Sequence, residues 1–355
     1  MATPVIILIR NVNTRRTGFA VLYMFTASVV MNLATSLAWY RNPRELGSLP
    51  DVTHDLFPDV SGPVTHKLPY VGEVEFNWSE IMDNTLLLEF AATVIFMFNL
   101  KPYHRQAVIR RFFSMYGTLQ FMRTCTVCLT SLPDAFPRCR EITPIGDLSN
   151  GGSTWGAMWN DTATVQEIFI HAGLILIPVH PITCGDMIFS GHANTALLFA
   201  LTWHTYYKFV PQAVNLTKTF VWMVSFFVAG LLCATRVHYT LDVVLSFYFT
   251  MTVWSSYHRL IIDCSLGRRF ISVWVIDAWF IYPIVEFMET PLEGERKVPD
   301  FTGDTSELSL FDLQVLGIKL DNAEEERKLG RYRASSYSES EFISFLPKVR
   351  VEKND

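Results

Sequence analysis

Long apolar stretches recur along the first 260 residues, and they limit the folds that this chain can adopt. Half of its 355 residues are hydrophobic and 18% are charged, which is less charge than a soluble protein of this length carries. About 20 consecutive apolar residues are enough for a helix to cross a bilayer. Hydropathy predicts six such spans, at 17–39, 81–100, 112–132, 185–207, 219–236 and 239–257. The sequence therefore predicts an all-α membrane protein with six transmembrane helices.

The remaining segments complete the predicted organisation. Segment 165–182 is apolar but contains Glu167 and two histidines, so we expect it to dip into the membrane or lie on its surface; a seventh span is the alternative. The predicted domains are a cytosolic N-terminus at 1–16, a six-span membrane domain at 17–260, an interfacial helix at 261–288 and a polar, disordered cytosolic tail at 289–355.

Basic residues predict the orientation of these spans, because short cytosolic loops are enriched in Lys and Arg. They lie before span 1, between spans 2 and 3 and after span 6: Arg10, Arg15, Arg16, Lys101, Arg105, Arg110, Arg111, Arg259, Arg268 and Arg269. The loop after span 1 is acidic instead. Both termini are therefore expected in the cytosol, with loops 40–80 and 133–184 facing the lumen or exterior. Cys139 and Cys184 lie on that second side, where they are either disulfide-bonded or two free thiols.

Two polar motifs interrupt the apolar pattern. They are CGDMIFSGHANT at 184–195 and RVHYTLDVV at 236–244, and the predicted topology brings both to one face of the membrane. His238 and Asp242 are four residues apart, hence on one face of a predicted helix, where the carboxylate can fix the tautomer of the imidazole. Asp186 and Ser190 have the same spacing at the start of span 4. Ionisable groups at membrane depth are costly and usually functional, although a satisfied interfacial histidine is the plainer interpretation of each residue alone.

The pairing of Ser-Gly-His with His-x-x-x-Asp resembles the type 2 phosphatidic acid phosphatase superfamily. The resemblance implies a helical core of that type, in which His238 attacks phosphorus, Asp242 orients it and His192 protonates the leaving group. Those phosphatases also hold phosphate with a Lys-x6-Arg-Pro element. The chain contains no Arg-Pro dipeptide, which argues against a plain lipid phosphatase.

The sphingomyelin synthase family is a closer resemblance. The two motifs are similar to its paired signatures, RRFFSMYGTLQFMR at 110–123 to its third-span signature, and SLPDVTHDLFP after span 1 to its first lumenal segment. The resemblance covers about residues 15–260. Two departures concern Ala193, where the family usually has Thr, and Arg236, which is more typical of inositol-phosphoryl relatives. Thr195 either replaces the missing hydroxyl, or that hydroxyl is dispensable.

This resemblance implies a transferase that moves a phospho-head group onto ceramide, most simply phosphocholine from phosphatidylcholine, giving sphingomyelin and diacylglycerol. Synthesis of ceramide phosphoethanolamine or inositol phosphorylceramide, lipid hydrolysis, and non-catalytic ceramide binding are the alternatives. Arg123 and Arg236 are candidates for phosphate contact, Asp186 and Ser190 for substrate binding, and Arg123 is alternatively a structural partner of Asp186. The partners implied are the lipid substrates and the bilayer, in the Golgi or plasma membrane, with a homodimer possible. Neither a cofactor, a metal nor nucleic acid is implied.

Overall fold

The computed structural model describes residues 12–42, 47–57, 59–62, 64–68, 72–100, 102–140, 162–176, 184–207, 215–265 and 281–289. The predicted N-terminal segment up to residue 11 and the tail from 290 onward lie outside the described residues. By its internal contacts the chain divides into two units. Residues 1–258 and 272–284 form the first, and 259–271 with 285–355 form the second. Both motifs lie in the first unit.

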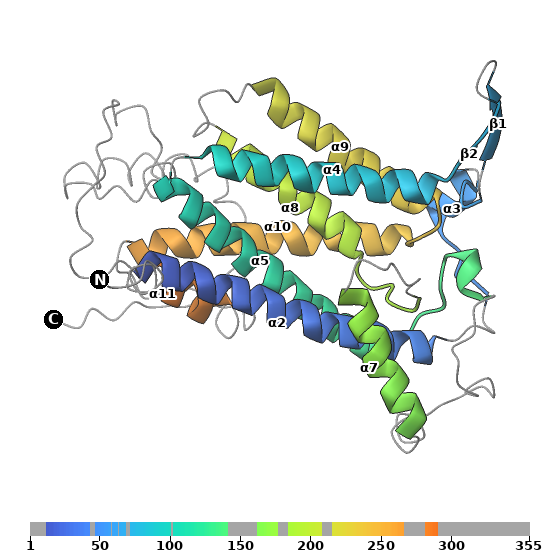
Figure 1. Cartoon of the computed structure of the whole chain (residues 1–355), viewed down its shortest axis with the longest axis horizontal. Helices are drawn as coiled ribbons and strands as arrows, with labels where there is room; N and C mark the ends of the chain where they lie inside the picture. Colours follow the sequence, from blue (N-terminus) through green and yellow to red (C-terminus); the bar gives the residue numbers. More distant parts are fainter. Residues whose placement is uncertain are drawn as a thin grey trace, which may run out of the picture. The chain divides into compact units, whose positions relative to one another are not determined.

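Helices α2 (Val12–Arg41) and α5 (Pro102–Leu129) pack side by side in the first unit (Figure 1). Buried alanines line the contact face of α2 and allow a close approach: Ala20, Ala27, Ala34 and Ala38. At Gly117 of α5 the helices approach so closely that a Cβ would lie 2.7 Å from the Tyr23 ring. The Tyr23 hydroxyl also lies 3.2 Å from Thr118 Oγ1. This pairing fixes the helix that carries Arg123.

A second group of helices comprises α4 (Trp78–Asn99), α8 (Gly191–Tyr206) and α9 (Asn215–Ala234). Their common core includes Met82, Ala196, Val228 and Leu232. Polar contacts also join these helices: Ser225 Oγ lies 2.6 Å from Glu89 Oε1 of α4 and 3.0 Å from the carbonyl oxygen of Ala196 of α8. The packing places the first turns of α4 and α8 beside each other.

Helix α10 (Thr240–Ser265) begins at the same end of the unit as α8. The rings of Phe189 and Phe249 lie 5.0 Å apart between centres, and Tyr206 Oη lies 2.8 Å from His258 Nε2. The helix continues to Ser265, so residues 261–265 belong to it rather than to a separate interfacial helix. Within the predicted segment 261–288, the structure also describes a short α11 (Tyr282–Glu289).

Helix α7 (Thr162–Leu176) occupies the segment for which we expected a membrane-dipping or surface element. It packs against α2, and Ser36 Oγ lies 2.9 Å from His171 Nδ1. Its 15 residues are fewer than a spanning helix needs. The seventh-span alternative is therefore not supported by the described part of α7.

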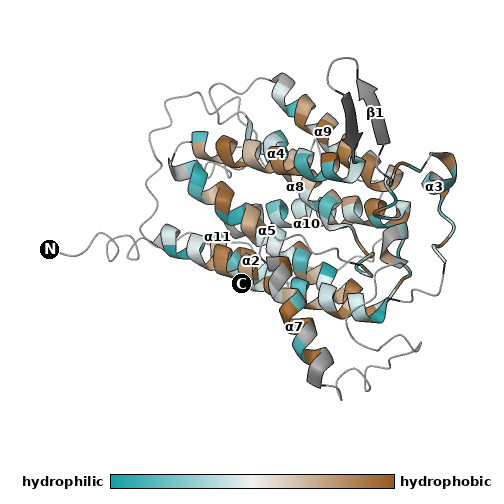
Figure 2. Ribbon diagram, turned by 45° about the vertical axis from the view of Figure 1, so that its right-hand side comes forward, coloured by the Kyte–Doolittle hydropathy of each residue, from teal (hydrophilic) through white to brown (hydrophobic). Residues whose placement is uncertain are grey.

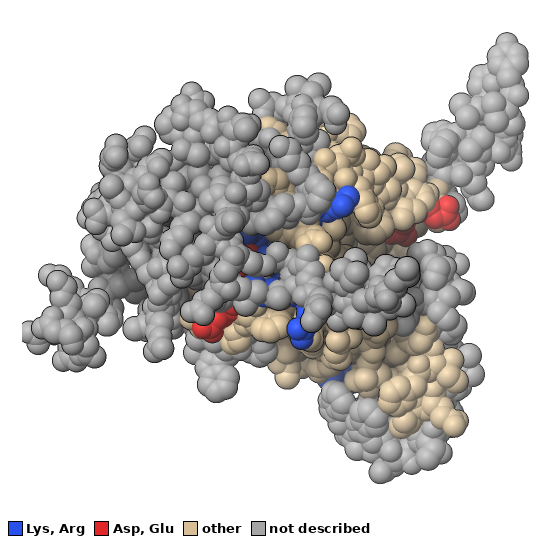
Figure 3. Space-filling view, turned by 60° about the vertical axis from the view of Figure 1, so that its left-hand side comes forward, with Lys and Arg blue, Asp and Glu red and all other residues tan. Residues whose placement is uncertain are grey.

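Three of the described helices are long and apolar enough to cross a membrane: Thr14–Arg41, Trp78–Asn99 and Thr217–Ala234. Large apolar side chains are exposed on them, including Leu22, Leu88 and Phe227, and Figure 2 shows brown, hydrophobic residues along these helices. In the space-filling view most of the described surface is uncharged (Figure 3). The predicted spans in α5, α8 and α10 are helical but are not among the three. Six spans therefore remain a prediction, as do cytosolic termini.

The connections contain elements that hydropathy did not predict. Between α2 and α4 lie the short helix α3 (Val52–Leu56) and an antiparallel hairpin of β1 (Val64–Leu68) and β2 (Gly72–Phe76). After α5 comes the 3-10 turn η1 (Pro137–Arg140). Cys139 in that turn is disulfide-bonded to Cys184, which decides between the two alternatives left open by the sequence. The bond closes a loop of 45 residues, and such a closure stabilises a fold by about 4 kcal/mol in the chain-entropy account.

Candidate active site

The loop before α8 carries the first part of the first motif. Gly185 has a φ of 84°, and a Cβ there would lie 2.5 Å from the carbonyl oxygen of Ala38, so the position requires glycine. Its N–H donates to Asp134 Oδ2 at 2.6 Å. Asp186 follows in this loop rather than in a helix, because α8 begins at Gly191. The prediction that Asp186 and Ser190 share a helical face is therefore wrong.

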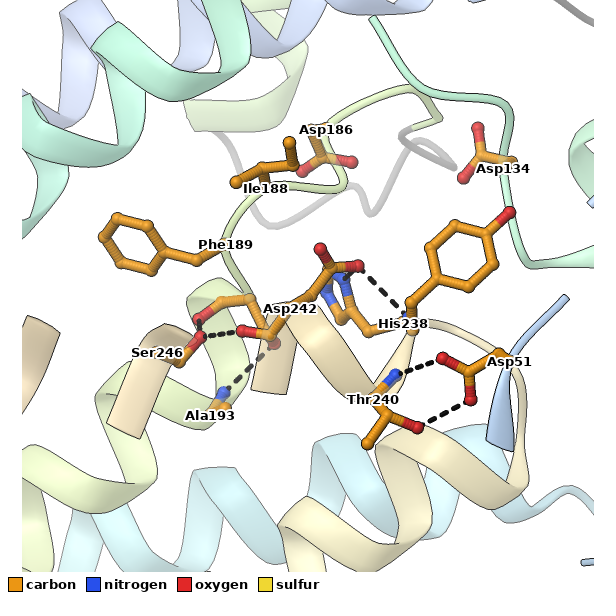
Figure 4. Close-up of polar contacts among 12 residues, drawn as sticks. Asp51, Asp134, Asp186, Ile188, Phe189, Ala193, His238, Thr240, Asp242 and Ser246 are labelled. Atoms are coloured by element: carbon orange, nitrogen blue, oxygen red, sulfur yellow. Dashed lines mark hydrogen bonds and ion pairs between the residues drawn. The ribbon is translucent and has the colours of Figure 1, made fainter. Parts of the chain in front are cut away.

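Ser190 is the N-cap of α8. Its hydroxyl accepts a hydrogen bond from the N–H of Ala193 at 3.2 Å, which satisfies one of the open donors of the first turn. Ser190 is fully buried, and its own N–H donates to the carbonyl oxygen of Asp242 at 3.3 Å. The Ser246 hydroxyl lies within hydrogen-bond distance of both the Ser190 and Asp242 carbonyl oxygens, at 2.9 and 2.7 Å (Figure 4). Ser190 thus joins the two motifs.

His238 and Asp242 lie together at the start of α10. Asp242 is in the first turn, whereas His238 precedes the helix, so the predicted placement of both on one helix is wrong although the pairing is not. His238 Nδ1 lies 3.7 Å from Asp242 Oδ2, and the two side chains are 4% and 1% exposed. Asp242 Oδ2 accepts from the N–H of Tyr239 at 3.1 Å. Among the described residues, neither His238 Nδ1 nor Asp242 Oδ1 has a hydrogen-bond partner, so the two side chains lie next to each other without being hydrogen-bonded.

His192 lies in the first turn of α8 and faces His238. The centres of the two imidazole rings are 6.3 Å apart. His192 Nε2 also lies 3.4 Å from Asp83 Oδ1 of α4, a residue that the sequence analysis missed. The one available signal was an acidic residue close to the start of an apolar run. Thr195, the possible replacement for the missing Thr at 193, donates to the carbonyl oxygen of Gly191 at 2.8 Å, a bond within its own helix.

Arg123 of α5 reaches the same end of the unit. Its Nε donates to the carbonyl oxygen of Phe189 at 2.7 Å, and its Nη2 pairs with Asp186 Oδ2 at 2.7 Å. Its Nη1 lies over Gly191, where a Cβ would come within 2.8 Å. The structural alternative, an ion pair with Asp186, is therefore present. Nη1 points at the start of α8, where a phosphate would meet open main-chain N–H groups.

Arg236 is held by the loop between α2 and α4. It has a φ of 57°, its Nε lies 3.3 Å from Asp59 Oδ2, and its Nη2 donates to the carbonyl oxygen of His54 at 3.4 Å. These contacts engage Nε and Nη2 of the Arg236 guanidinium with protein groups. Phosphate contact by Arg236 remains a prediction.

Asp51 ties the same loop to α10. The N–H and hydroxyl of Thr240 donate to its carboxylate at 2.8 and 2.6 Å (Figure 4), and Thr53 donates at 2.8 Å. Burial by itself raises the pKa of Asp51, but the hydrogen bonds from Thr240 and Thr53 outweigh it and lower the pKa to about 2. His54 Nε2 lies 3.3 Å from the carbonyl oxygen of His238. The loop between α2 and α4 therefore contacts the backbone of His238 through His54 and the start of α10 through Asp51.

Among the described residues, one group of side chains has metal-ligand types close together: Asp134, Cys139 and Cys184, with ligand atoms within 4.8 Å of one another. The two sulfurs are bonded to each other and are not thiolates. Asp134 accepts hydrogen bonds from Gly185 and from Asn42 at 2.6 Å. The group therefore has a structural role: it joins the segment after α5 to the loop before α8.

Comparison with known proteins shows what the part of the chain that carries both motifs is similar to. Residues 183–259, which contain both motifs, match the family model described as PAP2 superfamily C-terminal. Sphingomyelin synthase-related protein 1 of Mus musculus is 30% identical over 193 residues, which are 54% of this chain and 36% of that protein. Its Homo sapiens counterpart is 31% identical over 193 residues, again 54% of this chain and 41% of the relative.

A longer match extends over most of the chain. Phosphatidylcholine:ceramide cholinephosphotransferase 2 of Mus musculus is 26% identical over 285 residues, which are 79% of this chain and 68% of that protein. The matched regions span less than half of the two sphingomyelin synthase-related proteins. The chain carries a PAP2-type domain, and these relatives support the sphingomyelin synthase family that the motifs indicated.

Proposed function

We propose that the protein is a sphingolipid synthase, which transfers the phospho-head group of a phospholipid to the primary hydroxyl of ceramide. The observation that carries this proposal is the meeting of two histidines, 6.3 Å apart between ring centres, each with a carboxylate within 4 Å. One phosphoryl group can bridge such a pair. A nucleophile and a separate proton carrier are what a two-step group transfer requires.

In the first step His238 attacks phosphorus. The new N–P bond forms as the P–O bond to diacylglycerol breaks, and His192 gives its proton to the departing oxygen. In the second step the ceramide hydroxyl attacks the phosphohistidine, and its proton returns to His192 as the N–P bond breaks. Asp242 orients His238 and stabilises its positive charge. Each proton transfer contributes about 10²–10⁴-fold to the rate.

Arg123 and the start of α8 supply the phosphate subsite. Nη1 of Arg123 and the first main-chain N–H groups of α8 converge beside Gly191, and both favour an anion there. Asp186 holds the other side of the guanidinium in place. Ser190 contributes by fixing the helix start rather than by an exposed hydroxyl.

Burial of the nucleophile favours transfer over hydrolysis. His238 is almost fully covered, so water has little access to a phosphohistidine formed there. A lipid phosphatase or phospholipase with the same domain is the second candidate, since a PAP2-type domain also suits that chemistry. Ceramide-dependent release of diacylglycerol separates the two.

Phosphatidylcholine is the donor that we favour, because one relative is named phosphatidylcholine:ceramide cholinephosphotransferase 2. Phosphatidylethanolamine and phosphatidylinositol are the competing donors. A Golgi or plasma-membrane location, a site facing the lumen or exterior and a homodimer complete the proposal. Microscopy of tagged protein and its mass in detergent test the location and the oligomer.

The function is tested with purified full-length protein, fluorescent ceramide and each donor in turn, beside His238→Ala. One fluorescent phosphosphingolipid, absent with His238→Ala, is the expected result and identifies the donor. Donor cleavage without transfer to ceramide, abolished by the same substitution, would make the protein a hydrolase. Ceramide binding with no turnover of any kind would leave a lipid-binding protein and refute the mechanism.

A further inference from the structure

Asp83 is an acidic side chain outside both motifs, and it contacts His192. It lies in the second turn of α4, and its Oδ1 is 3.4 Å from His192 Nε2. The side chains of Asp83 and His192 are 54% and 39% exposed, so neither is shut into the core. In the described part of the chain, no hydrogen bond connects Asp83 to another residue, whereas nearby Glu80 accepts one from Asn77 at 3.2 Å.

A structural role accounts poorly for this contact. Ion pairs between groups this exposed contribute about 0–1 kcal/mol to folding. The packing of α4 on α8 comes from apolar residues such as Met82 and Ala196, which are buried beside it. Removal of the Asp83 charge is therefore expected to leave the fold unchanged.

A carboxylate beside an imidazole has a defined chemical effect. It accepts a hydrogen bond from the nearer ring nitrogen, which fixes the tautomer and the orientation of the ring. Here the nearer atom is Nε2, at 3.4 Å, so Nδ1 is the ring nitrogen that Asp83 leaves unengaged. The two motif carboxylates have other neighbours: Asp186 forms an ion pair with Arg123, and Asp242 lies 3.7 Å from His238 Nδ1. Among the described residues, Asp83 is the carboxylate in contact with the His192 ring.

We propose that Asp83 is a positioning residue for His192, holding Nε2–H so that Nδ1 exchanges the proton with the lipid oxygens. This inference rests on the proposed function, in which His192 is the proton carrier. It assigns one carboxylate to each histidine, from two different helices. The His238 pair is buried and serves the nucleophile, whereas the His192 pair is open and serves the group that must meet two successive substrates.

The test compares Asp83→Asn, Asp83→Glu and the matched control Glu80→Gln, all in full-length protein. With Asp83→Asn we expect kcat to fall on the order of 10–100-fold, with KM for both lipids and the unfolding temperature unchanged. Asp83→Glu should recover part of the rate, and Glu80→Gln should behave as wild type. In a His192→Gln background, Asp83→Asn should cause no further loss.

A second readout does not depend on turnover. Nitrogen NMR of ¹⁵N-histidine-labelled protein, with His192 assigned by the signal missing in His192→Gln, reports which ring nitrogen carries the proton. We expect Nε2–H in the wild type and a mixture in Asp83→Asn. An unchanged tautomer, an unchanged kcat, or an equal loss with Glu80→Gln would each overturn the proposal. If the wild type makes no phosphosphingolipid, the proposed function fails, and the tautomer still decides the role of Asp83.

Discussion

The main-chain N–H of Ser190 donates to the main-chain carbonyl of Asp242, 3.3 Å away. This bond joins the residue that caps α8 to the residue that faces His238. Backbone contacts of this kind fix two segments more firmly than contacts between side chains, because no rotamer change can release them. The relative position of the two histidines therefore depends on the joint between α8 and α10.

Ser246→Ala should loosen that joint. The hydroxyl contacts the carbonyl oxygens of both Ser190 and Asp242, so its loss should lower the free energy of unfolding by about 1 kcal/mol. A small displacement of reacting groups costs more in rate, and we expect kcat to fall by about 10-fold. Thermal unfolding and the ceramide assay measure the two effects. Thr252→Ala is the control, because its hydroxyl bonds only within α10; an equal loss there would contradict the prediction.

Gly191→Ala should displace Arg123. The added methyl would lie 2.8 Å from Nη1, and the guanidinium has to leave its place beside the start of α8. We expect kcat/KM for the donor to fall by about 10-fold, with little change in unfolding temperature, because the side chain can move aside. Gly230→Ala in α9 has nothing within 4 Å of its added methyl and should keep full activity. Normal donor kinetics in Gly191→Ala would remove Arg123 from the phosphate subsite.

Asp51 gives the fold a defined acid sensitivity. Its pKa in the folded state is about 2, below the ordinary value of 3.8, so its contribution to stability is fully present above about pH 4. That contribution disappears as the pH falls through 2. The difference in unfolding temperature between wild type and Asp51→Asn should therefore be constant from pH 5 to 7 and shrink between pH 4 and 2, roughly the range between the two pKa values. A difference that stays constant down to pH 2 would contradict this prediction.

Arg236 and Asp59 should act as a unit. Their ion pair fastens the loop to the turn that carries His238, and a partly exposed pair contributes up to about 1 kcal/mol. Arg236→Gln and Asp59→Asn should each reduce activity by a few-fold, and the double variant should be no worse than either one. If Arg236 instead holds phosphate, Arg236→Gln alone will raise KM for the donor, and the two losses will multiply.

Hydropathy located the helices better than their ends. The predicted span 17–39 lies inside α2 (Val12–Arg41), and the predicted span 81–100 overlaps all but the first three residues of α4 (Trp78–Asn99), because long apolar runs define both. The predicted span 185–207 starts six residues before α8. Met187, Ile188 and Phe189 are apolar, but they belong to the loop that precedes the cap at Ser190. Transfer free energy does not distinguish a buried loop from a helix.

Only part of the site could be predicted, because local spacing does not report contacts between distant segments of the chain. His192, His238 and Asp242 could be found because their spacing is a local signature. Asp83 could not, because its partner lies on a helix more than 100 residues away and no spacing rule connects them. Asp51 appeared in the sequence only as one of several acidic loop residues, and its role as a cap for α10 follows from tertiary packing alone.

The bond between Cys139 and Cys184 also makes one part of the site sensitive to the redox state around it. It anchors the loop that holds Asp186 against Arg123, and disulfides persist only in oxidising compartments. In reducing surroundings the bond does not form, and the loop lacks that anchor even when the helices are folded. Reduction of the bond should therefore loosen the loop that carries Asp186, which links the order of the proposed phosphate subsite to the redox state of its surroundings.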